Sequence, residues 1–167
     1  MNLNDLPSGE MVVVDANILL YAVQQVSPQC KRLLERCADD EITAMLPVNL
    51  LAEIMHHLMT AEARENGWIK GPNPARQLAA QPDLVKKLMR YEEFVRDILT
   101  IGFQLEPLTH EDFLTAMTVQ RRFGLLTKDA LSVALALRLR VKSFASADKA
   151  FTQVQGLLVY APDDLPD

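Results

Sequence analysis

Short runs of β-branched and apolar residues alternate along the chain with longer stretches that have the apolar spacing of a helix. The short runs predict strands at 11–15, 42–46, 102–107, 143–146 and 157–160. The longer stretches predict helices at 17–23, 28–38, 47–66, 82–100, 109–123 and 127–140. Strands that alternate with helices are typical of an α/β domain with a mainly parallel central sheet flanked by helices.

Helix-start signals and breakers set the boundaries of these elements. Pro28 and Pro47 stand where helices are expected to begin, a position at which proline is tolerated. Thr109 is the expected cap of the helix that follows it. The segment 67–74 is dense in Gly and Pro and is the one clear loop. We therefore expect a single domain over 1–167, with a Gly/Pro-containing helical insertion around 62–82.

Composition narrows the class of protein only slightly. The chain has 167 residues, of which 49% are hydrophobic, enough for one domain with its own core. No apolar run reaches the roughly 18 residues of a membrane helix, and the first residues carry no basic cluster, so neither a membrane span nor a signal peptide is expected. Cys30 and Cys37 are too far apart on one predicted helix to pair, which favours reduced thiols in a cytoplasmic protein.

The net charge of −5, taken alone, disfavours a nucleic-acid partner. That objection disappears if four of the 22 acids hold a cation, because 18 acids then face 17 Lys and Arg. Candidate acids follow from the fold. Ligand sites in open α/β sheets form beyond the carboxyl ends of the strands. Four acids are expected at that edge: Asp15, Glu53, Asp129 and Asp148.

Each of these acids also has a purely structural explanation. Asp15 and Asp148 stand where they cap the turns that follow. Asp129 complements the positive end of a helix that is otherwise apolar on nearly every side. Glu53 lies on the flank of an apolar stripe, as a solvated acid does. Four acids at one edge of the sheet favour a shared function over four separate structural roles.

The segments 13–20 (VVDANILL), 128–136 (KDALSVALA) and 145–151 (ASADKAF), with Glu53 between them, resemble the PIN domain family in order and spacing. The resemblance covers most of the chain and implies a Mg²⁺-dependent ribonuclease, with Mn²⁺ as the alternative ion. It gives Asp15, Glu53, Asp129 and Asp148 the catalytic and metal-binding roles, and Asn17 and Ser146 supporting roles. Cleavage in this family leaves a 5′-phosphate and a 3′-hydroxyl. Clustered carboxylates do require a compensating cation, and hard oxygen ligands suit these ions.

Among PIN domains, this chain resembles VapC-type toxins in organisation, which implies a cognate antitoxin protein and a homodimer as further partners. It is longer than expected for such a toxin because of the insertion. Two other functions stay open: a housekeeping RNA-processing nuclease with the same site, and an inactive scaffold that binds RNA or protein.

Several other polar residues have more than one explanation each. Glu62 and Glu65 are rivals of Glu53, but they lie late in the same helix. His57 is four residues from Glu53, which makes it a candidate neighbour of that carboxylate. Trp68 stacks on a base, packs its loop down or contacts a partner chain. Four cations flank the acidic segments as phosphate contacts or as ordinary surface: Arg121, Arg122, Lys128 and Lys149. The three histidines, His56, His57 and His110, do not form a zinc set.

Overall fold

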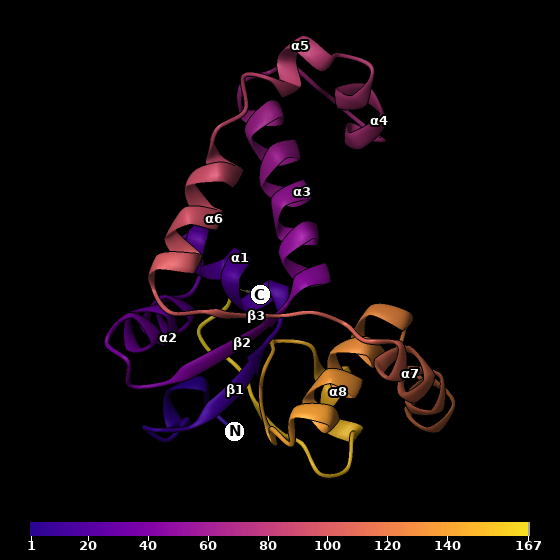
Figure 1. Cartoon of the computed structure of the whole chain (residues 1–167). Coiled ribbons are helices and arrows are strands. Elements are labelled where there is room, and N and C mark those ends of the chain that lie inside the picture. The colour runs from indigo at the N-terminus through magenta and orange to yellow at the C-terminus, as the bar shows by residue number, and fades with distance from the viewer. Residues whose placement is uncertain (167) are drawn as a thin grey trace.

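The computed structural model describes residues 1–166, which form one five-stranded parallel sheet with helices on both faces (Figure 1). The strand order is β3–β2–β1–β4–β5, and all four pairings are parallel. The strands are β1 (Met11–Val14), β2 (Thr43–Pro47), β3 (Gln104–Glu106), β4 (Ser143–Ala145) and β5 (Leu158–Tyr160). The prediction of an α/β fold with a mainly parallel sheet is confirmed.

The helices lie between the strands along the chain. They are α1 (Ala16–Val23), α2 (Pro28–Ala38), α3 (Val48–Glu65), α4 (Pro74–Ala79), α5 (Pro82–Val85), α6 (Arg90–Thr100), α7 (His110–Phe123) and α8 (Thr127–Leu139). Two 3₁₀ helices are η1 (Leu3–Asp5) and η2 (Lys149–Gln153). Pro28 and Thr109 start their helices as expected, and Thr109 forms a capping box with Asp112.

The central strand β1 is buried on both of its faces. Val12 and Val14 belong to a core made with α1, α2, α3 and α6, whereas Val13 belongs to a second core made with α7 and α8. Neighbouring residues of a strand point to opposite faces, so a sheet covered on both sides needs a continuous apolar run. The run Met11–Val14 meets this need, and it holds the following residue at the carboxyl edge of the sheet.

Helices α3 and α6 rise from the sheet, and α4 and α5 lie at their far end (Figure 1). We call residues 64–90 the arm. It has a small core, made by Ile69, Leu78 and Leu88 of the arm together with Ala63 of α3, which directly precedes it. Trp68 packs against this core, so among its three explanations the structure shows the one in which it packs its loop down.

The predicted helix over 82–100 was wrong, because the structure has two helices there, α5 and α6. The break has a tertiary cause. Glu62 of α3 is buried, and its carboxylate accepts hydrogen bonds from the backbone N–H groups of Met89 (3.2 Å) and Arg90 (3.0 Å). These N–H groups open α6, so Glu62 replaces the cap that Met89 does not supply. The short helix α4 lies within the helical insertion expected around 62–82, and it begins at Pro74, the last residue of the segment expected to be loop.

No helix within residues 1–166 combines the length and the apolarity that crossing a membrane requires. Cys30 and Cys37 are buried free thiols on α2, in agreement with the prediction that they do not pair.

Candidate active site

Asp15 lies at the carboxyl end of β1, where the strand turns into α1. Its side chain is 6% exposed. One carboxylate oxygen accepts the backbone N–H of Ala16 at 2.7 Å, which caps α1. The other oxygen accepts two side-chain donors, the Asn17 amide at 2.7 Å and the Ser146 hydroxyl at 2.7 Å. Asp15 therefore does cap α1, as its structural explanation predicts. Its other carboxylate oxygen, however, is bound by the side chains of Asn17 and Ser146.

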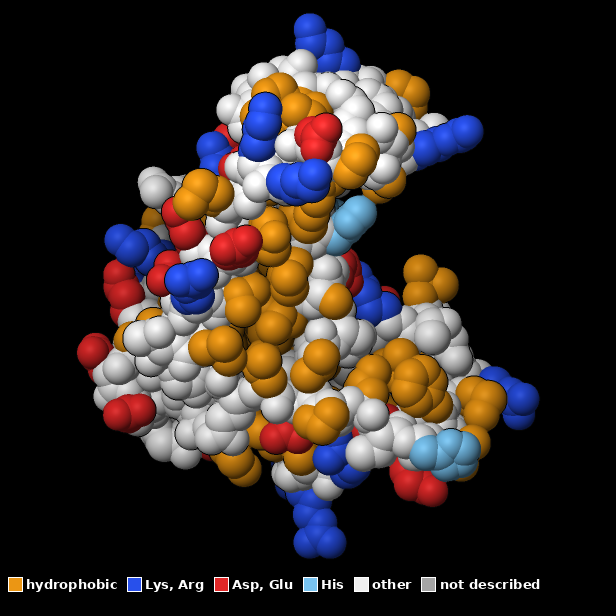
Figure 2. Space-filling model, turned by 45° about the horizontal axis from the view of Figure 1, so that its top comes forward, with side chains coloured by type: hydrophobic (Ala, Val, Ile, Leu, Met, Phe, Trp, Pro, Cys, Tyr) orange, Lys and Arg blue, Asp and Glu red, His pale blue; other side chains and the backbone are white. Residues whose placement is uncertain are grey.

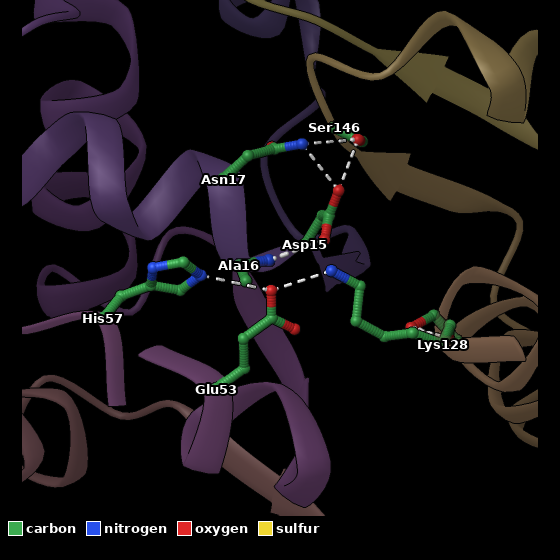
Figure 3. Close-up of polar contacts among 8 residues, drawn as sticks. Asp15, Ala16, Asn17, Glu53, His57, Lys128 and Ser146 are labelled. Carbon is green, nitrogen blue, oxygen red and sulfur yellow. Dashed lines mark hydrogen bonds and ion pairs between the residues drawn. The ribbon is translucent and has the colours of Figure 1, made fainter. Parts of the chain in front are cut away.

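Asn17 and Ser146 connect the ends of β1 and β4. The Asn17 amide also donates to the Ser146 hydroxyl oxygen at 3.2 Å, and its carbonyl oxygen accepts the backbone N–H of Ala147 at 3.2 Å. Ser146 is fully buried and accepts the backbone N–H of Asp148 at 3.0 Å. The two residues thus orient Asp15 directly (Figure 3). They also fix the backbone that carries Asp148.

Glu53 comes to the same edge from the second turn of α3. Its carboxylate contacts the ammonium group of Lys128, with Nζ 2.8 Å from Oε1. His57, one turn further along α3, places Nε2 3.6 Å from the same oxygen. Figure 3 shows the His57 ring and the Lys128 side chain both directed at Glu53, with the Lys128 ammonium between Glu53 and Asp15. Lys128 therefore contacts an acid of the cluster, a role that the sequence analysis did not consider.

Asp129 and Asp148 complete the group of four acids. Asp129 is half-buried in the first turn of α8, beside Lys128. Asp148 is exposed and caps η2, accepting the backbone N–H of Ala150 at 2.8 Å. Asp129 is close enough to Asp148, Glu53 and Asp15 for their charges to affect one another. The structure thus brings all four acids to one edge of the sheet.

The electrostatics of this edge reflect burial and crowded negative charge. Burial raises the pKa of Asp15 above its usual range, although hydrogen bonds from Ser146 and Ala16 and the charge of Lys128 partly oppose it. Burial also raises the pKa of Asp129, and the charges of Asp148 and Glu53 act in the same direction. For Lys128, burial lowers the pKa, but the hydrogen bond and charge of Glu53, with the charges of Asp15 and Asp129, outweigh it, and the net shift is upward.

The chemistry of these side chains fits a divalent cation. All four are oxygen donors, which Mg²⁺ and Mn²⁺ prefer. Burial first, and then the charge of a neighbouring acid, raises the pKa of both Asp15 and Asp129, and a bound cation opposes both effects. Within residues 1–166, however, no three Asp, Glu, His or Cys side chains are grouped closely enough to bind one metal ion as they stand. The cation that lies among them here is the Lys128 ammonium.

The rival acids of α3 have other partners. Glu62 caps α6, and Glu65 forms an ion pair with Arg90. Neither contacts the four acids, so Glu53 is the acid that α3 presents at the carboxyl edge.

The sequence matches the model of the PIN domain family over residues 12–157, a span that contains all four acids. The chain belongs to the PIN domain family. No curated protein matches it as a relative.

Solved structures show the same PIN fold at low sequence identity. A chain of a toxin–antitoxin complex from Klebsiella pneumoniae is 15% identical, with a TM-score of 0.57; the match covers 88% of this chain and 95% of that one. A chain of VapBC2 from Rickettsia felis, bound to a DNA fragment from its promoter, is 15% identical, with a TM-score of 0.58; the match covers 92% of this chain and 99% of that one.

Proposed function

We propose that this PIN domain is a metal-dependent endoribonuclease and the toxin of a toxin–antitoxin pair. The observation that carries the proposal is the meeting of four acids from four different elements at the carboxyl edge of the sheet. Family membership and the likeness to chains of toxin–antitoxin complexes support the class of activity and the class of partner.

Each acid has a role that its position supports. Asp15, Glu53, Asp129 and Asp148 hold the metal ion, and Asp15 is the most firmly oriented of them, since Asn17 and Ser146 both donate to it. When bound, Mg²⁺ or Mn²⁺ lowers the pKa of a coordinated water and neutralises charge on the scissile phosphate. Lys128 releases Glu53 for this purpose, and its ammonium group is then available to a phosphate oxygen of the RNA.

The test is RNA cleavage by the purified protein in Mg²⁺ or Mn²⁺ and in EDTA, beside the Asp129→Asn variant. This substitution keeps the shape of the side chain and removes one charge of the cluster. Lys142→Met is a control remote from the site, because Lys142 is exposed and precedes β4, at the opposite edge of the sheet from Asp148. Cleavage that needs both the metal and Asp129 supports the nuclease. Equal cleavage by Asp129→Asn, or cleavage in EDTA, contradicts it.

A second experiment separates a toxin from a housekeeping nuclease. Expression of a toxin arrests growth, and Asp15→Asn relieves the arrest because it removes a charge from the buried end of the site. A small protein encoded beside the toxin and co-purifying with it is the expected antitoxin. Growth that the active protein does not affect indicates RNA processing instead. A homodimer is the expected oligomeric state, which light scattering of the purified protein tests, and the cytoplasm is the expected location.

A further inference from the structure

The arm differs in charge from the rest of the molecule. Residues 64–90 contain six Lys and Arg but two acids, which gives a net charge of +4, so the rest of a chain of net charge −5 carries −9. Two of the six cations are neutralised locally, Lys86 by Asp83 and Arg90 by Glu65. The other four are exposed and have no ion pair within residues 1–166: Arg64, Lys70, Arg76 and Lys87.

These charges stand on a folded support. Besides its small core, the arm is held by Gln77, whose side-chain amide donates to the carbonyl oxygens of Lys70 and Pro72, both at 2.8 Å. The carboxylate of Glu62 fixes the return of the chain into α6. The cations of the arm are therefore presented from a preorganised surface, which reduces the entropy that a partner must offset on binding.

The arm stands on the same helix as part of the acidic site. Glu53 and Arg64 both belong to α3 and are eleven residues apart, about 16 Å along the helix axis. Figure 2 shows Lys and Arg side chains projecting from the end of the arm, and a deep hollow between the arm and the part of the molecule below it. An RNA strand that reaches the acidic site through this hollow passes next to the arm several nucleotides away from the site.

We infer that the arm is a second contact surface for RNA, which binds the sugar–phosphate backbone several nucleotides away from the bond that is cut. This inference rests on the proposed function only in taking RNA as the substrate. Its physical basis is that exposed Lys and Arg neutralise phosphates and release counterions without reading the base sequence. The surface compensates for the negative charge of the remaining molecule, which otherwise repels RNA.

The surface suits a nucleic acid better than an acidic protein. Protein interfaces are built around an apolar core with a polar rim. The apolar side chains of the arm pack into its own core. Within residues 1–166, Met89 is the one large hydrophobic residue that the arm exposes. What remains on its surface is mostly charged and polar, as in nucleic-acid contacts.

The experiment measures binding in EDTA, so that cleavage does not enter. Fluorescence anisotropy of a labelled 20-nucleotide single-stranded RNA is followed over a range of KCl concentrations. The arm variant is Lys70→Gln/Arg76→Gln/Lys87→Gln, three exposed positions that are not part of the core of the arm. The control variant removes the same charge elsewhere: Arg32→Gln/Arg140→Gln/Lys142→Gln. Arg32 lies on α2, and the other two precede β4, at the opposite edge of the sheet from Asp148.

The arm variant is expected to bind the RNA about ten- to a hundredfold more weakly at low salt, and the control variant to bind within about threefold of the wild type. The plot of log affinity against log salt concentration becomes less steep by about 2 for the arm variant, since each of three lost phosphate contacts accounts for roughly 0.7 on a single strand. The single variants Lys70→Gln, Arg76→Gln and Lys87→Gln give the same test if the triple variant unfolds.

Equal affinities and slopes for the two triple variants would overturn the inference, as would a wild-type protein that binds no RNA. An arm variant that keeps its RNA affinity but loses binding to poly-glutamate overturns it in favour of an acidic protein partner. Failure of the proposed nuclease activity is distinguishable from failure of this inference. RNA binding that needs the arm, in a protein that cleaves no RNA in Mg²⁺ or Mn²⁺, supports the surface and contradicts the enzyme.

Discussion

Removing the charge of Lys128 tests the ion pair at the centre of the site. Lys128→Met keeps the length of the side chain and abolishes its contact with Glu53, where Nζ now lies 2.8 Å from Oε1. The ammonium also offsets the charges of Asp15 and Asp129. We expect the metal-free variant to be less stable than the wild type and, in contrast, to bind Mg²⁺ more tightly.

The magnitude follows from the exposure of the pair. The side chains of Lys128 and Glu53 are 46% and 26% exposed, so solvent screens much of their attraction. Two unit charges 2.8 Å apart attract by about 1.5 kcal/mol in bulk water and about 6 kcal/mol at an effective dielectric constant near 20. Ordering of the side chains and salt reduce measured values for exposed pairs to about 0.2–1 kcal/mol. A loss of about 1 kcal/mol corresponds to a decrease of about 2–4 °C in Tm for a chain of this size.

The same free energy appears with the opposite sign in metal binding. A divalent cation must take the place of Lys128 beside Glu53 in the wild type, but it meets no competing cation in the variant. The loss of about 1 kcal/mol therefore becomes roughly fivefold tighter binding of Mg²⁺. Differential scanning calorimetry with and without Mg²⁺ measures the stability, and calorimetric titration measures the affinity. The increase in Tm on adding Mg²⁺ should be larger for the variant.

Two comparisons decide whether the effect passes through Glu53. In the background of Glu53→Gln, Lys128→Met should change metal affinity and Tm much less, because the pair is already broken. Lys142→Met, the exposed lysine before β4, should change neither quantity. If Lys128→Met left the metal-free Tm unchanged, or weakened Mg²⁺ binding, the ammonium would not be the competing cation, and the reasoning would be refuted.

Three further predictions concern other titratable groups. Asp129→Asn should abolish RNA cleavage without lowering the metal-free free energy of unfolding, since burial and the charges of Asp148 and Glu53 raise the pKa of Asp129; a clear loss in urea unfolding would contradict this. Burial raises the pKa of Cys30 to about 11 and that of Cys37 to about 12, so an aromatic disulfide reagent at pH 8 should modify neither thiol until urea is added, and then both. Burial tends to raise the pKa of Asp112, but hydrogen bonds from Thr109 and Arg138 outweigh it and lower the pKa. The stabilisation by this carboxylate is then present above the unfolded pKa of about 3.9 and is lost as the pH falls through the lower folded value. Asp112→Asn should cost about 2 kcal/mol at pH 7 and less at pH 3, which urea unfolding at the two pH values measures.

Local signals were sufficient to predict most of the fold. The run Met11–Val14 has the continuous apolar character of a strand buried on both faces, and it is that strand. Thr109 and Asp112 carry their capping box in the sequence, so the start of α7 follows from four residues. The position of Asp15 was predictable for the same kind of reason, because a polar residue directly after a buried parallel strand must lie at the carboxyl edge.

The features that escaped prediction depend on contacts between distant segments. The break between α5 and α6 is made by Glu62, whose nearest partner is 27 residues away along the chain. The pairing of Lys128 with Glu53 spans 75 residues, and nothing in the sequence around either residue indicates it. Both cases involve a charged side chain whose partner is fixed only when helices from opposite parts of the chain meet. The packing of distant elements also assembles the acidic site, because the four acids come from separate elements and the Lys128 ammonium among them comes from α8. Sequence spacing therefore predicted which four carboxylates lie at one edge of the sheet. The Lys128 ammonium that contacts Glu53 among them could be identified only from the structure.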